Sequence, residues 1–573
     1  MALRRYLPFL NWPRLTLKRF EREFLAGLTV GLMALPQSVA YAGLAGMPLV
    51  TGIYATLLPT LVAALFSATP RLAVGPTALT CLLVFGALSG MAEPGSAQWV
   101  LLAGWLALLS GVFQMGLGVL RQGWLMDLVS SPVLMAFTQA AALLIITSQI
   151  PAMLALEWGS GSVQAWHLPS AVLGTLSLVL ILACKRLRPS IPAVFFLLVI
   201  TAGAAWWWDW DTHGIAVVGA LPAGFPPLGL PGALSLQDLI SLVVPALVIA
   251  LVSFMETAAS ARLDSTQSGE RWNRDQDLIG QGAAKLSAAL CGAFPTSSSF
   301  SRSALNLFAG AQSGWSNVFC CVVVAVVLAV GLPVLAWVPR AVLAAVVVAS
   351  VLGLFKWQPW KLLWLTSRRD LFVAVPTLVI TYVAAPSMYW GICAGLVLSL
   401  LIFVYRRLNP RIVELGRHPD QSLRDRKVWN LPPLHPECLV LRPDCSLDYL
   451  IAPAFERRML DFCEGRDDLR AVYIFLTGVN LIDATGLEVL TRLFEQFRKQ
   501  GIDIHLVGAK LEVDRRMKLL FSRREDIRFH RTEQEALEAM QAMAPVREDK
   551  GSESDKDTVE ACPVPVTGTA KVG

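Results

Sequence analysis

Residues 294–303 read Phe-Pro-Thr-Ser-Ser-Ser-Phe-Ser-Arg-Ser, a run of small hydroxyl side chains around Arg302. No Asp, Glu, Lys or Arg follows Arg302 until Arg340. A charge at membrane depth costs at least a few kcal/mol, so it normally faces a cavity or a partner. Because a cation surrounded by hydroxyl donors can replace the water around an anion, we expect Arg302 to bind an anion that the protein moves.

Charged residues are distributed unevenly along the 573 residues. The chain is 55% hydrophobic and only 16% charged, whereas a soluble domain carries roughly 25% charged residues. From Leu408 onward the sequence has the composition of a soluble protein. We predict a cytoplasmic N-terminal segment (1–22), a transmembrane domain (23–407), a linker (408–429), a soluble domain (430–545) and a disordered tail (546–573).

Hydrophobic stretches recur through the transmembrane domain, and each is long enough to be a membrane span or a half-helix. We count about fourteen, which predicts an α-helical membrane protein. They lie near residues 24–45, 49–67, 75–91, 98–119, 125–148, 168–184, 190–208, 239–261, 277–293, 300–312, 315–331, 338–356, 370–386 and 389–407.

Basic residues gather in alternate loops of this arrangement. They are Arg71, Arg121, Lys185, Arg186, Arg188, Arg262, Arg271, Arg274, Lys356, Lys361, Arg368 and Arg369. By the positive-inside rule these loops and both termini are cytoplasmic. The formal net charge of +6 is then explained by topology and by contact with anionic membrane lipid, so we expect no nucleic-acid partner.

Two of the predicted segments are short and interrupted. The third begins Val-Gly-Pro-Thr at 74–77, and the tenth begins in the serine run after Pro295. Short, Pro/Gly-interrupted segments at corresponding places in two halves indicate the substrate site of an inverted-repeat transporter. A weak internal echo, Thr-Ala-Leu at 77–79 against Ser-Ala-Leu at 303–305, agrees. Facing half-helix N-termini would offer free N–H groups to an anion; the alternative is ordinary kinks and packing contacts.

Two further ionisable residues lie within predicted membrane segments. Glu256 follows a run without charges that begins at Leu239. A carboxyl group removed from water favours its neutral form, so Glu256 can accompany an anion with a proton. The alternative is a structural ion pair with Arg302 or Lys285. Lys285, in the ninth segment, either extends to the interface or pairs with a carboxylate.

Three long motifs carry a resemblance to a known family. Residues 35–48 read Leu-Pro-Gln-Ser-Val-Ala-Tyr-Ala-Gly-Leu-Ala-Gly-Met-Pro, residues 299–306 read Ser-Phe-Ser-Arg-Ser-Ala-Leu-Asn, and residues 479–487 read Val-Asn-Leu-Ile-Asp-Ala-Thr-Gly-Leu. With them the chain resembles the sulfate permease (SulP) family, bacterial relatives of pendrin and prestin, over about residues 20–545. The resemblance implies a seven-plus-seven inverted repeat divided into a core and a gate domain, and a homodimer.

The resemblance also implies a set of site residues between the third and tenth segments. Glu256 matches the coupling position, where sodium-coupled bicarbonate members carry Asp. The anion-binding positions that match the family are Gln37, Tyr41, Pro76, Thr77, Ala78, Ser301 and Arg302.

The soluble domain alternates strand and helix patterns, which indicates an α/β fold. It resembles a STAS domain, shared with anti-sigma-factor antagonists, whose phosphorylated loop Asp-Ser-Ser-Gly reads Asp483-Ala484-Thr485-Gly486 here. Thr485 stands at the phosphorylatable position, but we favour a helix-capping role for its hydroxyl. We see no nucleophile–base constellation in this domain and no zinc spacing among the cysteines, so we expect no enzyme activity, metal or other cofactor.

These features predict a transporter in the inner membrane. We expect transport to be secondary, because no GxxxxGK[ST] motif for ATP is present. We favour proton-coupled sulfate uptake, with a STAS domain that regulates transport, assists dimerisation or docks a cytosolic partner. Other readings remain open: a C4-dicarboxylate or bicarbonate substrate, a passive anion channel, or a sensor whose membrane part only binds. Glu256 in place of Asp disfavours sodium-coupled bicarbonate transport.

Overall fold

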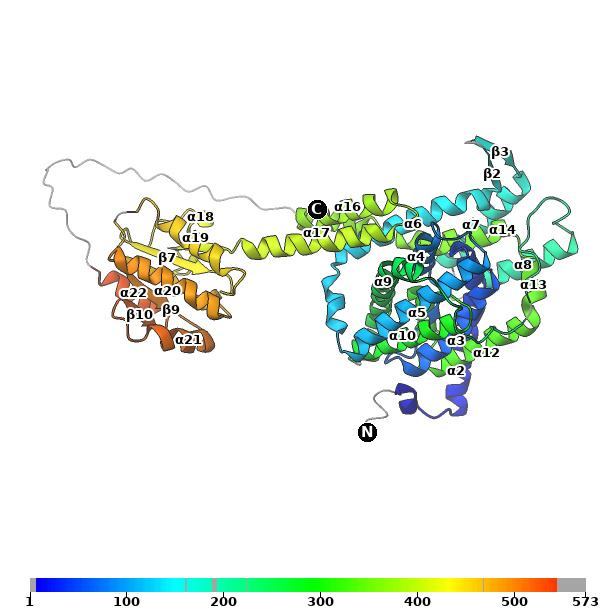
Figure 1. The fold of residues 1–573 in the computed structure, drawn as a ribbon, viewed down its shortest axis with the longest axis horizontal. Helices are drawn as coiled ribbons and strands as arrows, with labels where there is room; N and C mark the ends of the chain where they lie inside the picture. Colours follow the sequence, from blue (N-terminus) through cyan, green and yellow to red (C-terminus); the bar gives the residue numbers. More distant parts are fainter. Residues whose placement is uncertain are drawn as a thin grey trace. The chain divides into compact units, whose positions relative to one another are not determined.

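The computed structural model describes residues 7–159, 162–187, 193–222, 224–269, 271–466 and 468–543. The expected tail and the first six residues of the expected N-terminal segment lie outside this part of the chain. The structure divides into two compact units, Met1–Ile402 and Phe403–Gly573, and each is described by itself (Figure 1).

The first unit is helical, and each of the fourteen predicted segments coincides with a helix. Seven of the described helices are long and apolar enough, by length and composition, to cross a membrane. The helices are α2 (Leu17–Leu44), α3 (Val50–Phe66), α4 (Ala78–Leu88), α5 (Ala97–Val119), α6 (Ser131–Leu154), α7 (Leu168–Leu187), α8 (Ala193–Trp207), α9 (Leu236–Ser268), α10 (Arg274–Leu290), α11 (Phe300–Phe308), α12 (Trp315–Val326) with α13 (Leu332–Ala336), α14 (Arg340–Val351), α16 (Arg368–Val383) and α17 (Tyr389–Leu408).

Some elements of the first unit have no predicted counterpart. Residues 17–22, which we assigned to the N-terminal segment, already belong to α2, which begins at Leu17. The additional elements are the 3-10 turn η1 (Pro8–Asn11), the hairpin of β2 (Leu156–Gly159) and β3 (Ser162–Trp166), and the helix α15 (Gln358–Thr366).

The helices of the first unit pack in two groups. Helices α2, α3, α5, α9, α10 and α12 contact one another, whereas α6, α7, α14 and α16 form a second set of contacts. Glycines allow the close packing of α5 on α10, since a Cβ added at Gly282 would lie 2.6 Å from the Cβ of Met115. Two helix groups are what we expect of a core domain and a gate domain.

Two short helices, α4 and α11, begin side by side. Each follows a two-residue strand, β1 (Val74–Gly75) before α4 and β4 (Ser297–Ser298) before α11. The two strands pair antiparallel, with Val74 opposite Ser298 and Gly75 opposite Ser297. The two half-helices therefore start from one shared backbone ladder, although their sequences are more than two hundred residues apart.

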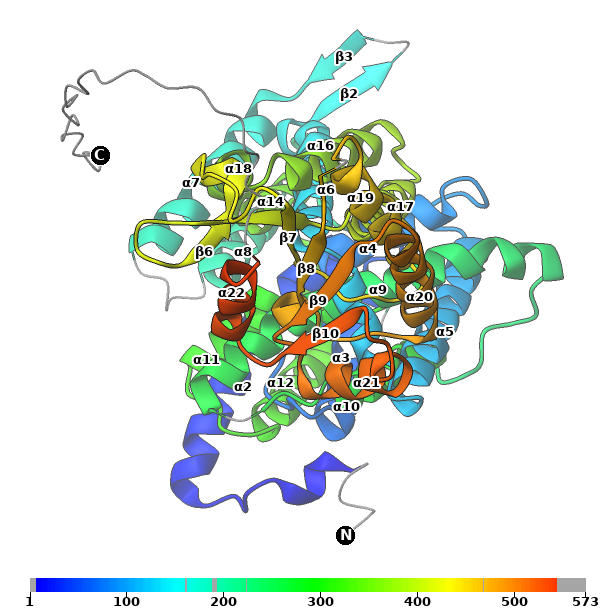
Figure 2. The same ribbon diagram turned by 90° about the vertical axis from the view of Figure 1, so that its left-hand side faces the viewer.

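The second unit is an α/β domain with a six-stranded sheet (Figure 2). The strand order is β10-β9-β8-β7-β5-β6. The four strands from β7 to β10 are parallel, and β5 runs antiparallel to both β7 and β6. The strands are β5 (Ile412–Arg417), β6 (Leu423–Asp425), β7 (Cys438–Pro443), β8 (Ala471–Phe475), β9 (Asp503–Val507) and β10 (Ile527–His530).

Helices cover both faces of this sheet. Side chains of Leu439, Val472 and Ile504 pack with α19 (Ala452–Cys463), α20 (Ala484–Lys499) and α21 (Leu511–Phe521). The alternate side chains, Val440 and Tyr473 among them, pack with α22 (Glu533–Gln541) on the opposite face. This alternation follows from the two-residue period of a strand that is buried on both sides.

The segment 408–429, which we expected to be a linker, belongs to this sheet. It contains β5, β6 and the short helix α18 (Arg426–Trp429), and β5 pairs with β7 from Ile412 to Glu414. The linker prediction was wrong because the strand is short and its apolar residues stand among charged ones. Such a strand becomes recognisable only when its partner in the sheet is known.

Candidate functional site

Arg302 lies in the first turn of α11 and is almost completely buried, with 1% of its surface exposed. Its Nη2 donates a hydrogen bond to the carbonyl oxygen of Pro76, 2.8 Å away. Its Nε and Nη1 have no hydrogen-bond partner among the residues that the structure describes. Buried donors are normally satisfied, so the guanidinium presents two donor nitrogens, Nε and Nη1, that can bind a ligand.

Gly75 lies directly against this guanidinium group. A Cβ added at Gly75 would lie 3.2 Å from Nη2 and 3.3 Å from Nη1 of Arg302. The glycine also has φ of +155°, which side-chain-bearing residues rarely adopt. The guanidinium can therefore approach the backbone of β1 this closely only because residue 75 has no side chain.

Glu256, on α9, faces the beginning of α4. Its Oε2 accepts hydrogen bonds from Thr77 Oγ1 at 2.9 Å and, more weakly, from Thr80 Oγ1 at 3.4 Å. The hydroxyl of Ser297, on β4, also interacts with this carboxyl group. Within the described chain Glu256 makes no ion pair at 4.0 Å or less. Hydroxyl donors rather than a salt bridge hold its carboxyl group beside the beginning of α4.

Thr77 joins Glu256 to the half-helix. It is the N-cap of α4, and its side chain accepts a hydrogen bond from the backbone N–H of Thr80. The same hydroxyl donates to Glu256. A change in the protonation of Glu256 would therefore alter the cap of α4.

Gln37 and Tyr41 are buried on α2 and face α14. Gln37 Nε2 donates to Ser350 Oγ at a long 3.4 Å. Tyr41 also interacts with Ser350, and it lies within electrostatic range of Arg302. These two predicted residues thus lie where α2 packs against α14 of the second helix group.

Ser301 is the exposed member of the predicted set. Its hydroxyl lies 3.4 Å from that of Ser299, and its side chain is solvent-accessible. The buried hydroxyls beside Arg302 belong to Ser297, Ser298 and Ser303. Of these, Ser303 Oγ accepts a hydrogen bond from the N–H of Ala73 at 3.0 Å and so ties α11 to the residue before β1.

Several contacts of this site were not predicted from the sequence. Thr80 could have been found, because it stands three residues after Thr77 and so shares its helix face. Ser297 stands in the quoted serine run. Ser350 lies in an Ala/Val-rich helix that carries no chemical signal, and its role depends on the packing of α14 against α2.

Thr485 does not cap the helix that begins beside it. The N-cap of α20 is Asp483, whose Oδ1 accepts from the N–H of Gly486 at 2.8 Å. Its Oδ2 accepts from the N–H of Tyr449 at 2.7 Å. Thr485 is already inside the helix, and its hydroxyl makes no hydrogen bond within the described part of the domain. The capping prediction was wrong because Asp483 occupies the non-helical position that a cap requires.

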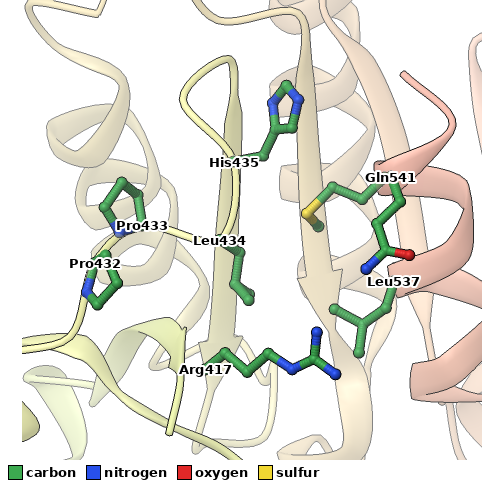
Figure 3. Close-up of a pocket in the computed structure, with 8 residues that line it drawn as sticks. Arg417, Pro432, Pro433, Leu434, His435, Leu537 and Gln541 are labelled. Carbon is green, nitrogen blue, oxygen red and sulfur yellow. The ribbon is translucent and has the colours of Figure 1, made fainter. Parts of the chain in front are cut away.

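The second unit contains a separate surface pocket of about 130 Å³ (Figure 3). It is open to solvent and has no acidic side chain in its lining. One wall comes from Arg417 and the segment 432–435, and the other from Leu537, Met540 and Gln541 of α22. None of the predicted binding residues lies in it.

Comparisons with known proteins match both units. Residues 20–377 match the Sulfate permease family, and residues 432–536 match the STAS domain. A protein named sulfate transporter 4.1, chloroplastic, from Arabidopsis thaliana is 27% identical, covering 86% of this chain and 76% of the relative. A protein named probable sulfate transporter from Mycobacterium tuberculosis is 29% identical, covering 86% of this chain and 90% of the relative.

A solved structure has the same fold. It is the murine Solute Carrier 26 family member A9 anion transporter in the inward-facing state, with a TM-score of 0.84 at 20% identity. The match covers 94% of this chain and 95% of the murine chain. The predicted fold, a helical membrane domain followed by a STAS domain, is thereby confirmed. Because the family match spans more than half of the sequence, this chain belongs to the sulfate permease family.

Proposed function

We propose that this protein is a secondary active transporter that takes up sulfate together with protons across the inner membrane, and that sulfate binds at Arg302. The observation that supports this most strongly is the buried guanidinium with two donor nitrogens that lack a partner in the described residues. A guanidinium offers parallel N–H donors to an oxyanion. The relatives named as sulfate transporters support the choice of sulfate.

The ends of the two half-helices would complete the binding shell. The first N–H groups of a helix have no partner within the helix, and they lie at the positive end of its dipole. In α4 these donors include Ala78, next to Pro76 and Thr77, and in α11 they include Ser301. Backbone donors from both repeats, together with Arg302, would replace the water that sulfate loses on binding.

Glu256 would carry the proton. Its carboxylate form accepts hydrogen bonds from Thr77 and Thr80, whereas its neutral form must also donate one. Protonation would therefore reorganise the cap of α4 and reduce the negative charge beside the sulfate site. Both effects would couple proton binding to anion binding.

The proposal includes the topology and assembly expected of the chain. Both termini would be cytoplasmic, the transmembrane domain would extend to about residue 407, and the protein would form a homodimer. The STAS domain would regulate transport or dock a cytosolic partner, with Thr485 as a candidate phosphorylation site. Its partly accessible hydroxyl, without a capping role, leaves that site open to modification.

Uptake into proteoliposomes tests the proposal. Purified protein should accumulate radiolabelled sulfate when the outside is more acidic than the inside, and the protonophore-treated control should lose this accumulation. Succinate and bicarbonate should be transported less well. Accumulation of succinate or bicarbonate but not sulfate would overturn the choice of substrate. Flux that only equilibrates sulfate would indicate a channel, and no flux from intact protein would reject transport.

A further inference from the structure

Lys285 is a completely buried lysine inside the helical unit. It lies on α10, with 0% of its surface exposed, and it is one of the largest fully buried side chains of the described chain. An ammonium group removed from water is destabilising by several kcal/mol unless it is paired and hydrogen-bonded. Its surroundings should therefore explain how the positive charge is accommodated.

Two neutral oxygen atoms hold the ammonium group. Lys285 Nζ donates to Gln114 Oε1 at 2.6 Å and to Ser253 Oγ at 2.7 Å. Ser253 Oγ in turn donates to Gln114 Oε1 at 3.2 Å. The other end of this amide, Gln114 Nε2, is buried without a hydrogen-bond partner in the described residues. The amide is thus oriented toward the cation even though its NH₂ group remains unsatisfied.

The counter-charge of Lys285 is Glu256, which it does not touch directly. The two groups interact through space. Ser253 and Ser297 connect them, because Ser253 accepts from Lys285 with its hydroxyl and from Ser297 Oγ, at 3.1 Å, with its carbonyl. Ser297 also interacts with Glu256. Lys285 is therefore a buried cation that Ser253 and Ser297 link to the proposed coupling carboxyl.

The oxygen atoms around Lys285 are of the kind that bind an alkali cation. The amide carbonyl oxygen of Gln114 and the hydroxyl oxygen of Ser253 are hard ligands that suit hard metal ions. Here the ammonium group already occupies the position on which they converge. Helix α5 packs closely on α10 at this point, since a Cβ added at Gly111 would lie 3.0 Å from the Cβ of Lys285.

We propose that Lys285 is a tethered cation that takes the place of a coupling sodium ion beside Glu256. The inference rests on the proposed function, in which Glu256 is the coupling carboxyl. Because a fixed positive charge lies in this place, no metal ion is needed to balance the negative charge of Glu256. The proton is then the only cation that binds and leaves during transport. Lys285 is then a determinant of ion specificity, and removal of its ammonium group should create a sodium site.

The test compares the wild type with Lys285→Ala and Lys285→Arg, using Lys356→Ala, an exposed lysine, as the matched control. Thermal unfolding of the purified full-length proteins is measured in sodium chloride and in choline chloride at equal ionic strength. We expect a sodium-specific, saturable rise in Tm for Lys285→Ala alone, because sodium then binds the folded state. Sulfate uptake by this variant should be lost in choline and restored by sodium.

Two results would overturn the inference. One is an equal Tm of Lys285→Ala in sodium and choline together with unchanged proton-driven uptake. The other is a sodium requirement of the wild-type protein, which needs no variant and holds even if Lys285→Ala fails to fold. Failure of the proposed function is recognised separately, because a wild type that moves no sulfate still permits the measurement of sodium-dependent Tm.

Discussion

Arg302 Nη2 and the carbonyl oxygen of Pro76 are joined by a hydrogen bond of 2.8 Å between residues 226 positions apart in the chain. This contact ties the start of α11 to the residues that precede α4. The antiparallel pair of β1 and β4 holds the same two segments together. A ligand that binds the free N–H groups of Arg302 therefore meets both half-helices at once.

The space over Gly75 should be essential for sulfate transport. In Gly75→Ala the new methyl group would lie within about 3.3 Å of both terminal nitrogens of Arg302. Because the guanidinium must then move and the backbone is strained at φ of +155°, we expect uptake to fall at least tenfold. Gly90→Ala is the matched control, since no atom lies within 4 Å of its added Cβ. Equal uptake by the two variants would contradict the assigned position of the anion.

Glu256→Gln should abolish the coupling of transport to protons. Glutamine keeps the shape of the side chain and an oxygen acceptor for Thr77, but it cannot bind or release a proton. We expect sulfate exchange across liposomes to persist while accumulation driven by a pH gradient disappears. Glu93→Gln, at an exposed loop position, should behave as the wild type. Gradient-driven accumulation by Glu256→Gln would show that another group carries the proton.

The cap of α20 predicts different effects for two neighbouring substitutions. Asp483→Ala removes the acceptor for both Gly486 and Tyr449, so the STAS domain should lose about 1–2 kcal/mol of unfolding free energy. Thr485→Ala should change this free energy by less than about 0.5 kcal/mol. Denaturant unfolding monitored on the STAS domain distinguishes the two. A larger loss of unfolding free energy for Thr485→Ala than for Asp483→Ala would contradict Asp483 as the N-cap and favour Thr485.

A histidine pair should make the STAS sheet sensitive to acid. His505 Nδ1 and His530 Nε2 are 2.8 Å apart, and His505 Nε2 is buried without a partner in the described residues. Burial, together with the neighbouring His530 and Arg528, lowers the pKa of His505 to about 4. Because this pKa lies below the ordinary value of about 6.5, the folded state resists the proton. The contribution of neutral His505 to the free energy of unfolding is fully present above the ordinary pKa of about 6.5. It is lost as the pH falls from there toward 4.

Hydrogen exchange of the full-length protein measures this effect. After correction for intrinsic rates, amides of β9 and β10 should lose protection below the ordinary histidine pKa. His505→Phe keeps a ring to stack on Tyr473, 4.1 Å away in the wild type, and cannot be charged, so its protection should depend less on pH. Identical pH dependence in the two proteins would place the sensitivity elsewhere.

The sequence predicted the membrane fold well because its signals are local. Runs of apolar residues indicated all fourteen helical segments, and Pro and Gly marked the two that are short. The internal echo gave the wrong register, since it aligned Thr77 with Ser303 although the residues before the two half-helices are Thr77 and Ser299. Capping depends on backbone conformation, which a three-residue match does not contain.

The contacts between distant segments could not be predicted from the sequence. Glu256 and Thr77 are 179 positions apart, and Lys285 reaches Gln114 on another helix. Each charged residue was recognisable as one that destabilises a membrane segment unless it has a partner. Its partners could not be named, because they depend on how α5, α9 and α10 pack. In the STAS domain, β5 and β6 were taken for part of a linker for a similar reason, because a short strand is recognisable only from the sheet that it joins.

The most direct test of the account is sulfate uptake by Arg302→Ala in proteoliposomes with an inward proton gradient. Arg340→Ala is the matched control, because Arg340 is an exposed arginine whose Nε bonds the carbonyl of Val217. Both proteins should elute as the wild type does and show the same helical content. We predict that Arg302→Ala takes up no more sulfate than protein-free liposomes, while Arg340→Ala retains wild-type uptake. Wild-type uptake and sulfate affinity in folded Arg302→Ala would contradict the assignment of the anion site.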